Sequence, residues 1–324
     1  MRTLSVARNL RRGLKNASYK SFLFLDRVGV HVLPKHYYTP LPDYAWLRRN
    51  EPLWMKRSSL VGIEWDLDRQ MRWVEETSRR FYDEVRGLAF YREVVAKRLG
   101  PGYGPIESQV LHCVLRRYAP GAIVEIGSGV STACMLHAIE RNAHEGKRAS
   151  RLTCVEPFPR PAFRGLPHVT HIEAPCQAVD AGVFESLGAG DLLFIDSSHA
   201  VKVGSDVVRI YLDILPRLPA GVLIHIHDIY LPYLYSRHVL DTYFGWQETV
   251  LVQALLAHNP HLHVLAALSA LHYDRRNELR AVLRDYAPQA DREGLPAGVD
   301  DGIAPVVPAA NERHFPSSLW LITA

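Results

Sequence analysis

One stretch of the sequence, residues 122–138, constrains the fold more than any other. It begins with the mostly apolar run Ala122–Ile126, which is typical of a buried strand in a parallel sheet. Gly127 and Gly129 then allow a sharp turn and let a ligand approach main-chain atoms that side chains would cover. Residues 130–138 follow as a helix-forming segment. This order predicts a ligand-binding unit at the carboxyl edge of a parallel sheet.

The rest of the chain repeats this alternation of strands and helices. Further apolar runs predict strands at residues 151–156, 169–174, 191–196, 222–228, 263–268 and 318–323. The segments between them predict helices at residues 180–187, 203–218 and 246–257. The alternation therefore predicts an α/β fold with a doubly wound, mostly parallel, seven-stranded Rossmann-like sheet.

The N-terminal third has a different character and predicts a cap. Aromatic residues and prolines in residues 27–60 predict extended, irregular chain, which either wraps the main domain or shapes a substrate pocket. Residues 66–97 predict a helical stretch in two pieces, split near Gly87. The glycine- and proline-rich loop at 100–105 predicts the boundary between a cap, residues 1–100, and the main domain, residues 101–324. Within the latter, proline-rich residues 287–317 predict a surface loop.

Composition excludes some classes of protein and leaves others open. A net charge of +4 over 324 residues does not indicate a nucleic-acid-binding protein. Residues 1–20 are basic, which is compatible with a solvated tail or with weak contact to an anionic membrane surface. The cysteines lack metal-site spacing, so we expect buried thiols in a cytoplasmic protein: Cys113, Cys134, Cys154 and Cys176. A monomer and a homo-oligomer are both compatible with the sequence.

Three kinds of ligand compete for the glycine turn. A dinucleotide fingerprint requires a third glycine where Thr132 stands, and a phosphate-binding P-loop requires a Gly-Lys-Ser/Thr sequence that is absent. What remains is an acid, Glu125, two residues before the first glycine. This Glu-x-Gly-x-Gly pattern, followed by Ser-Thr, resembles the S-adenosylmethionine turn of class I methyltransferases. The resemblance implies that the cofactor is held by Glu125, Gly127, Ser128, Gly129 and Thr132.

Acids also end the second and fourth predicted strands. Glu156 has the position that suits hydrogen bonds from both hydroxyls of a ribose, although a solvated acid at a strand end is the alternative. Asp196 either binds the amino end of the cofactor or takes part in binding a divalent cation such as magnesium. Both residues are therefore candidate cofactor ligands.

Two histidines accompany these acids. Transfer of a methyl group to an alcohol needs a general base, and the ordinary pKa of histidine, near ~6.5, suits that task. We expect His199 to be the base, acting beside Asp196, with capping of the next helix as the alternative. Asp228 is a candidate oxygen ligand of a cation, and His225 is expected to be a core histidine.

Several of these segments resemble one family. Gly127-Ser128-Gly129, the Ile195-Asp196-x-x-His199 turn and the Ile226-His227-Asp228-Ile229 strand end resemble the bacterial class I methyltransferases that include macrolide-sugar and polysaccharide-cluster O-methyltransferases. The resemblance implies a base at His199, magnesium at Asp196, His227 and Asp228, and a final strand antiparallel to the others. This sequence departs from the family pattern because His227 stands where an acid is expected.

The favoured function is thus S-adenosylmethionine-dependent O-methylation of a hydroxyl on a sugar, glycan or small polyol. We expect the acceptor to enter beside residues 30–60 and 230–245, where Tyr230, Tyr233, Tyr235 and Trp246 either stack on a sugar or belong to the core. Two alternatives stay open. They are an NAD(P)-dependent Rossmann oxidoreductase, disfavoured by the missing third glycine, and a non-catalytic protein of the same fold in a glycan-assembly complex.

Overall fold

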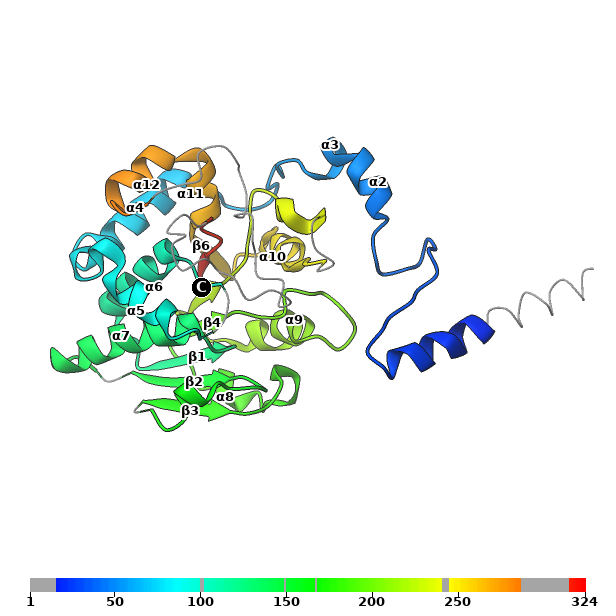
Figure 1. Ribbon diagram of the computed structural model, residues 1–324. Coiled ribbons are helices and arrows are strands. Elements are labelled where there is room, and N and C mark those ends of the chain that lie inside the picture. The colour runs from blue at the N-terminus through cyan, green and yellow to red at the C-terminus, as the bar shows by residue number, and fades with distance from the viewer. Residues whose placement is uncertain (1–15, 100–101, 149, 167, 241–244, 287–314) are drawn as a thin grey trace, which may run out of the picture. The chain divides into compact units, whose positions relative to one another are not determined.

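The computed structural model describes residues 16–99, 102–148, 150–166, 168–240, 245–286 and 315–324 (Figure 1). The chain divides into two compact units, residues 1–51 and 52–324, and each is described by itself. The start of the basic segment, residues 1–15, and residues 287–314 of the predicted surface loop lie outside the described residues. The predicted division into a cap and a main domain at residue 100 stays a prediction.

The larger unit is built on one seven-stranded sheet, which confirms the predicted α/β architecture. Its strand order is β3-β2-β1-β4-β5-β7-β6. The strands are β1 Ala122–Ile126, β2 Arg151–Val155, β3 Val169–Ile172, β4 Leu192–Ile195, β5 Leu223–Ile226, β6 Leu262–Ala267 and β7 Leu319–Thr323. β7 runs antiparallel to both of its neighbours, as the family resemblance implied, and the pairs among β1 to β5 are parallel.

The register of the parallel strands brings their ends into line. Ile126 of β1 pairs with Val155 of β2 and with Ile195 of β4, and Ile195 pairs with Ile226 of β5. The residues that follow these four strand ends therefore meet at one edge of the sheet. The chain order also reverses between β1 and β4, and ligands of open α/β sheets bind at such a point.

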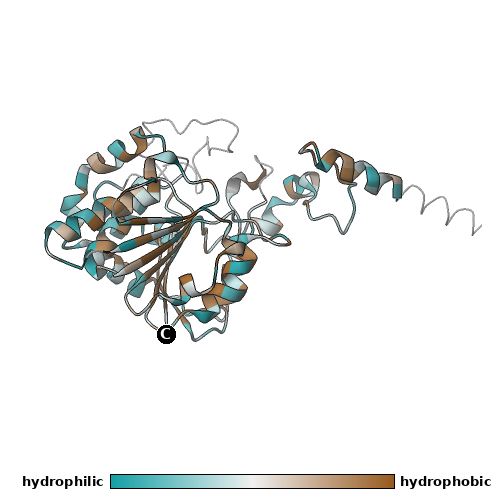
Figure 2. Cartoon of the chain, turned by 90° about the horizontal axis from the view of Figure 1, so that it is seen from below, coloured by the Kyte–Doolittle hydropathy of each residue, from teal (hydrophilic) through white to brown (hydrophobic). Residues whose placement is uncertain are grey.

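Helices cover both faces of the sheet, as the labels in Figure 1 and the apolar strands between helical layers in Figure 2 show. The first apolar core packs α4, α5, α6 and α7 against one face, and the second packs α8, α9 and α10 against the other. The helices of the larger unit beyond residue 66 are α4 Leu67–Ser78, α5 Ala89–Ala96, α6 Pro105–Tyr118, α7 Val130–His144, α8 Gly182–Glu185, α9 Asp206–Arg209, α10 Glu248–Leu256, α11 Leu268–Asp274 and α12 Arg276–Val282. Strands buried on both faces explain the continuous apolar runs of the sequence.

Local signals fix several helix ends. The side chain of Asp66 accepts a hydrogen bond from the backbone N–H of Arg69 and so caps the start of α4. The predicted break near Gly87 is confirmed, because this residue has a non-helical φ of +76°. It lies within the short 3-10 turn η2 Arg86–Leu88, which with η1 Tyr82–Glu84 separates α4 from α5. The proline at position 105 begins α6, where its missing N–H costs nothing.

The structure corrects two expectations about helices. The single helix expected at residues 203–218 is instead α9, a π-helical turn η5 Ile210–Ile214 and a 3-10 turn η6 Leu215–Arg217. The start is set by the Ser205 cap, and Pro216 cannot continue a regular helix. Within residues 27–60, expected to be irregular, two short helices form, α2 Tyr44–Arg49 and α3 Glu51–Trp54. Asp43 caps α2 by accepting from the backbone of Trp46.

All four cysteines are buried free thiols, as expected. None of the helices among the described residues combines the length and the apolar character that crossing a membrane requires.

Candidate active site

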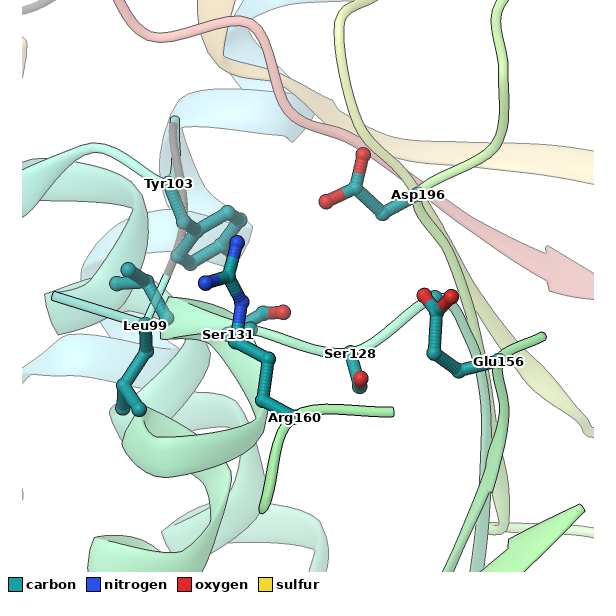
Figure 3. Close-up of a pocket in the computed structure, with 10 residues that line it drawn as sticks. Leu99, Tyr103, Ser128, Ser131, Glu156, Arg160 and Asp196 are labelled. Atoms are coloured by element: carbon teal, nitrogen blue, oxygen red, sulfur yellow. The ribbon is translucent and has the colours of Figure 1, made fainter. Parts of the chain in front are cut away.

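A pocket opens at the aligned strand ends, beside the glycine turn and the first residues of α7 (Figure 3). It is lined by Leu99, Tyr103, Gly127, Ser128, Gly129, Val130, Ser131, Glu156, Arg160 and Asp196. Five of the predicted cofactor ligands, the residues of the Gly-Ser-Gly turn with Glu156 and Asp196, are therefore brought together. They come from the ends of three neighbouring strands, as the register of the sheet requires.

The backbone of the glycine turn packs closely against Asp196, the residue after β4, and the turn also lines the pocket. Gly127 has φ of +106°, and a Cβ atom there would lie 2.8 Å from the carbonyl oxygen of Asp196. Only glycine fits this position. The hydroxyl of Ser128 lines the pocket and has no hydrogen-bond partner among the described residues although it is buried. A buried hydroxyl without a partner is a candidate contact for a polar ligand.

Glu125 is not among the residues that line the pocket, and its contact with the cofactor stays a prediction. Its carboxylate is fully buried and accepts hydrogen bonds from Ser131 Oγ at 2.5 Å, Thr132 Oγ1 at 2.7 Å and Cys154 Sγ at 3.3 Å. Thr132 is buried as well and accepts a hydrogen bond from the backbone N–H of Gly129. Because side chains alternate along a strand, the acid of β1 points beneath the helix. Glu125 and Thr132 thus support the turn from below.

Burial dominates the electrostatics of Glu125. It raises the pKa of this carboxyl to about 7, against the opposing effect of the three donors. The support beneath the turn is therefore a carboxyl that titrates near neutral pH.

Glu156 and Arg160 bring opposite charges to the pocket (Figure 3). Glu156 Oε1 accepts a hydrogen bond from the backbone N–H of Phe158, which fixes the acid at the strand end. Arg160 was missed by the sequence analysis, because no motif marks a single arginine in the loop after β2. Its guanidinium provides donors suited to a carboxylate group of a ligand.

A second group of side chains, here called the histidine cluster, consists of Asp196, His199, His227 and Asp228. His199 Nε2 lies 3.5 Å from Asp196 Oδ1 and 3.6 Å from Asp228 Oδ2. His227 Nδ1 lies 3.4 Å and 3.6 Å from the same two oxygens. The catalytic and metal-binding residues predicted from the sequence are therefore neighbours, and Asp196 belongs both to this cluster and to the pocket.

Glu248, at the start of α10, holds His199 in place. Its Oε2 lies 2.7 Å from His199 Nδ1 and accepts from Ser197 Oγ, while its Oε1 accepts from the hydroxyl of Tyr211. The backbone N–H groups of Gln247 and Glu248 also donate to the carbonyl oxygen of His199. The sequence does not predict this role of Glu248, because its contact with His199 depends on how α10 packs beside the loop after β4. The alternative role for His199, capping of the next helix by its side chain, is not what the structure has.

Glu107 supports His227 from the other side. This buried carboxylate accepts hydrogen bonds from Ser318 Oγ at 2.6 Å and from the backbone of Ser317, and its Oε2 lies 3.6 Å from His227 Nε2. Ser318 also contacts His225, whose Nε2 lies 2.8 Å from the serine hydroxyl. His225 is therefore a core histidine, as expected, and burial lowers its pKa to about 3.

The charges of the histidine cluster compensate one another. Burial alone favours the neutral imidazole, but Asp196, Glu248 and Asp228 together raise the pKa of His199 to about 10. Burial also opposes the charge of Asp196, but His227 and His199 lower its pKa below the usual range. An imidazole accepts a proton only when it is neutral, and the carboxylates that face His199 favour its protonated form.

Magnesium, the ion implied for Asp196, His227 and Asp228, does not fit these donors. Mg²⁺ requires oxygen ligands in near-ideal octahedral geometry, whereas His227 brings a nitrogen to this position. Neighbouring ligands of an octahedral ion with bonds of about 2.0–2.1 Å lie about 2.9 Å apart, which is shorter than the 3.4 Å and 3.6 Å measured from His227 Nδ1.

The aromatic residues predicted to contact an acceptor lie in different environments. The ring of Trp246 lies 4.7 Å from that of His199, beside the histidine cluster. Tyr230 is buried, donates to Asp228 Oδ1 and stacks on Phe315, so it belongs to the core. Tyr233 packs against Tyr273 instead.

Comparisons with known proteins give a family match and several similar proteins. Residues 124–229, from β1 to just beyond β5, match the family described as a methyltransferase domain. Over 173 residues, the chain is 25% identical to an uncharacterized protein of Archaeoglobus fulgidus, which covers 50% of this chain and 77% of the relative.

Solved structures that resemble the chain include the methyltransferase PaMTH1 of Podospora anserina with S-adenosylhomocysteine, at 21% identity and a TM-score of 0.38, covering 73% of this chain and 93% of that one. They also include the O-methyltransferase TomG of Streptomyces achromogenes, at 17% identity and a TM-score of 0.36, covering 62% and 82%. A third is the mycinamycin-pathway methyltransferase MycE with Mg and S-adenosylhomocysteine, at 14% identity and a TM-score of 0.35, covering 72% and 54%.

Proposed function

We propose that this chain is a class I methyltransferase that uses S-adenosylmethionine and that it methylates a hydroxyl group of a sugar, glycan or small polyol. The methyltransferase domain match carries the class. The hydroxyl acceptor and the catalytic residues are our inference from the site. The observation that carries this inference is that Asp196 lines the cofactor pocket and also faces His199.

The pocket suits the cofactor. The unpartnered hydroxyl of Ser128 and the glycine backbone at 127 and 129 provide polar contacts without side-chain obstruction. Glu156 is placed to accept hydrogen bonds from ribose hydroxyls, and Arg160 to bind a carboxylate. When bound, S-adenosylmethionine supplies an electrophilic methyl group.

The proposed base is His199. Its Nδ1 faces the Glu248 carboxylate, so in the neutral imidazole Nε2 is the nitrogen that accepts the proton of an alcohol. Glu248 also fixes the orientation of the ring and stabilises the imidazolium that forms when the proton arrives. Asp196, at the end of β4, assists by holding a negative charge beside the same nitrogen.

Trp246 supports a sugar-like acceptor. Its ring lies beside the imidazole of His199, where an apolar face can pack against the ring of a sugar while a hydroxyl reaches the base.

The test is an acceptor screen with methyl-labelled S-adenosylmethionine. The purified full-length chain is incubated with monosaccharides, oligosaccharides, polyols, amines and thiols, and label transfer is measured. We expect label on a hydroxylated acceptor, with turnover lost in His199→Ala and retained in His261→Ala, a change at an exposed histidine of the loop before β6. Transfer only to amines or thiols, or full turnover by His199→Ala, would contradict the proposal.

A further inference from the structure

Two imidazoles and a carboxylate converge within the histidine cluster. One potential metal-binding atom from each of Asp196, His199 and His227 lies within 4.8 Å of the other two. Asp196 Oδ1 is 3.5 Å from His199 Nε2 and 3.4 Å from His227 Nδ1. In a tetrahedral site with metal–ligand bonds of about 2.0–2.1 Å, neighbouring donor atoms lie about 3.3–3.4 Å apart. The two measured separations match that arrangement.

The environment of His227 independently indicates a ligand. Its side chain is only 3% exposed, and neither ring nitrogen forms a hydrogen bond with any described residue. Nδ1 instead faces the carboxylates of Asp196 and Asp228. The carboxylates lie 3.4–3.6 Å from the ring nitrogens, beyond close hydrogen-bond distance, so an ion bound here would give His227 Nδ1 the close partner that it lacks.

The environment of His199 is also typical of a metal ligand. Its Nδ1 lies 2.7 Å from the carboxylate of Glu248, which is itself buried, while Nε2 faces the cluster. Metal-binding histidines almost always donate their second ring N–H to such an acceptor, which fixes the tautomer and the direction of the lone pair.

We propose that Asp196, His199 and His227 bind a divalent transition-metal ion such as Zn²⁺ or Co²⁺ in preference to Mg²⁺. Two imidazoles and one carboxylate form a donor set that suits first-row transition ions, whereas Mg²⁺ prefers oxygen. Asp228 Oδ2, 3.6 Å from each imidazole, adds negative charge beside the ion.

This site rests on the proposed function in one respect. The ion engages His199 Nε2, the atom that the proposed function assigns to the acceptor proton. A bound transition ion therefore inhibits methyl transfer.

The first experiment measures binding without turnover. Metal-free full-length protein is titrated with ZnCl₂, CoCl₂ and MgCl₂ by calorimetry, and the visible spectrum of the Co²⁺ form is recorded. We expect Zn²⁺ and Co²⁺ to bind roughly 100-fold or more tightly than Mg²⁺, with the intense Co²⁺ bands of a low-coordinate site. Absence of Zn²⁺ and Co²⁺ binding, or equal affinity for Mg²⁺, would overturn the inference.

Variants then test the ligands. His227→Ala abolishes Zn²⁺ binding, and His227→Glu, which supplies oxygen in place of nitrogen, shifts the preference toward Mg²⁺. His261→Ala is the control and keeps wild-type affinity, because its side chain is exposed. Circular dichroism verifies that each variant is folded. Unchanged Zn²⁺ affinity in folded His227→Ala would overturn the ligand assignment.

Turnover separates the failure of this inference from failure of the proposed function. We expect Zn²⁺ to stop methyl transfer over the concentration range in which it binds, while Mg²⁺ has no such effect. Failure to bind Zn²⁺ overturns the metal site and leaves the base assignment intact. Binding through His199 with undiminished turnover overturns the base assignment and leaves the metal site intact.

Discussion

The glycine turn and the histidine cluster lie at the same edge of the sheet, but the buried side chains at their centres differ in how many hydrogen bonds they form. Beneath the turn, Glu125 receives three donors from neighbouring side chains. In the cluster, both ring nitrogens of His227 lack hydrogen bonds, and His199 and Asp228 have positive φ values of 56° and 55°. Backbone strain and unmet polar groups are costly, and they gather where a protein acts on a ligand. The acid beneath the turn is thus fully hydrogen-bonded, although the turn itself keeps the unpartnered hydroxyl of Ser128, and the cluster is the part of the edge that we propose to be reactive.

The largest expected effect separates the two regions at His199. Replacing it with alanine removes the proposed base but touches no residue of the glycine turn. We expect turnover to fall by about 10²- to 10⁴-fold, the usual contribution of a general base, while cofactor affinity stays unchanged. Steady-state kinetics with labelled cofactor measure turnover, and calorimetric titration measures cofactor affinity. If turnover and cofactor affinity fell by the same factor, the histidine cluster and the glycine turn would not act independently.

Gly127→Ala tests the turn itself. A Cβ atom at this position meets the Asp196 carbonyl oxygen at 2.8 Å, in addition to the strain of φ +106°. Backbone strain alone is worth about 1–3 kcal/mol, so we expect lower stability in urea denaturation and loss of cofactor affinity. Gly146→Ala is the matched control, since Gly146 has φ of +72° but no atom near the new Cβ. If both variants lose the same stability, the close contact at Gly127 has no effect of its own.

The pH dependence of stability tests the buried acid beneath the turn. Burial raises the pKa of Glu125 from 4.5 to about 7, so the unfolded chain loses this proton at lower pH than the folded chain. Stability from this group therefore falls as pH rises from about 4.5 to 7, by about 3 kcal/mol in total. Glu125→Gln removes this titration. The difference in unfolding free energy between variant and wild type should grow in favour of the variant across that range, and a constant difference would show that Glu125 does not titrate there.

A smaller effect is expected at the rim of the pocket. Glu156→Ala removes an acceptor proposed to bind ribose hydroxyls, and a hydrogen bond to a charged group is worth about 1.5–3 kcal/mol. Calorimetry should show cofactor affinity reduced by about tenfold or more, with turnover at saturating cofactor retained. Glu173→Ala, a change at an exposed acid after β3, is the control. Unchanged affinity in Glu156→Ala would remove the ribose assignment.

The same contrast explains how much could be predicted from the sequence. Gly127, Glu156, Asp196 and His227 each follow a parallel strand, and the shared register of such strands is enough to bring them together. A local motif and a regular architecture are therefore sufficient for the outline of the site. The direction of Glu125 could not be predicted because the motif marks the residue but not the face of the strand to which it points.

The supports of the cluster depend on packing that no local pattern specifies. Glu248 and Tyr211 come from separate helical segments, and Glu107 lies on a helix that precedes the first strand. Their partners are set by how the helices pack on the two faces of the sheet. Likewise, the π-helical turn η5 interrupts a segment whose apolar pattern alone indicated one continuous helix.

The central claim is that the imidazole of His199 stands beside the methyl donor held by the glycine turn. A crystal structure with S-adenosylhomocysteine and a hydroxylated acceptor tests it most directly. We predict that the cofactor sulfur lies next to Asp196 and that the acceptor hydroxyl bridges it to His199 Nε2. A cofactor bound elsewhere, or an imidazole turned away from the sulfur, would contradict the account.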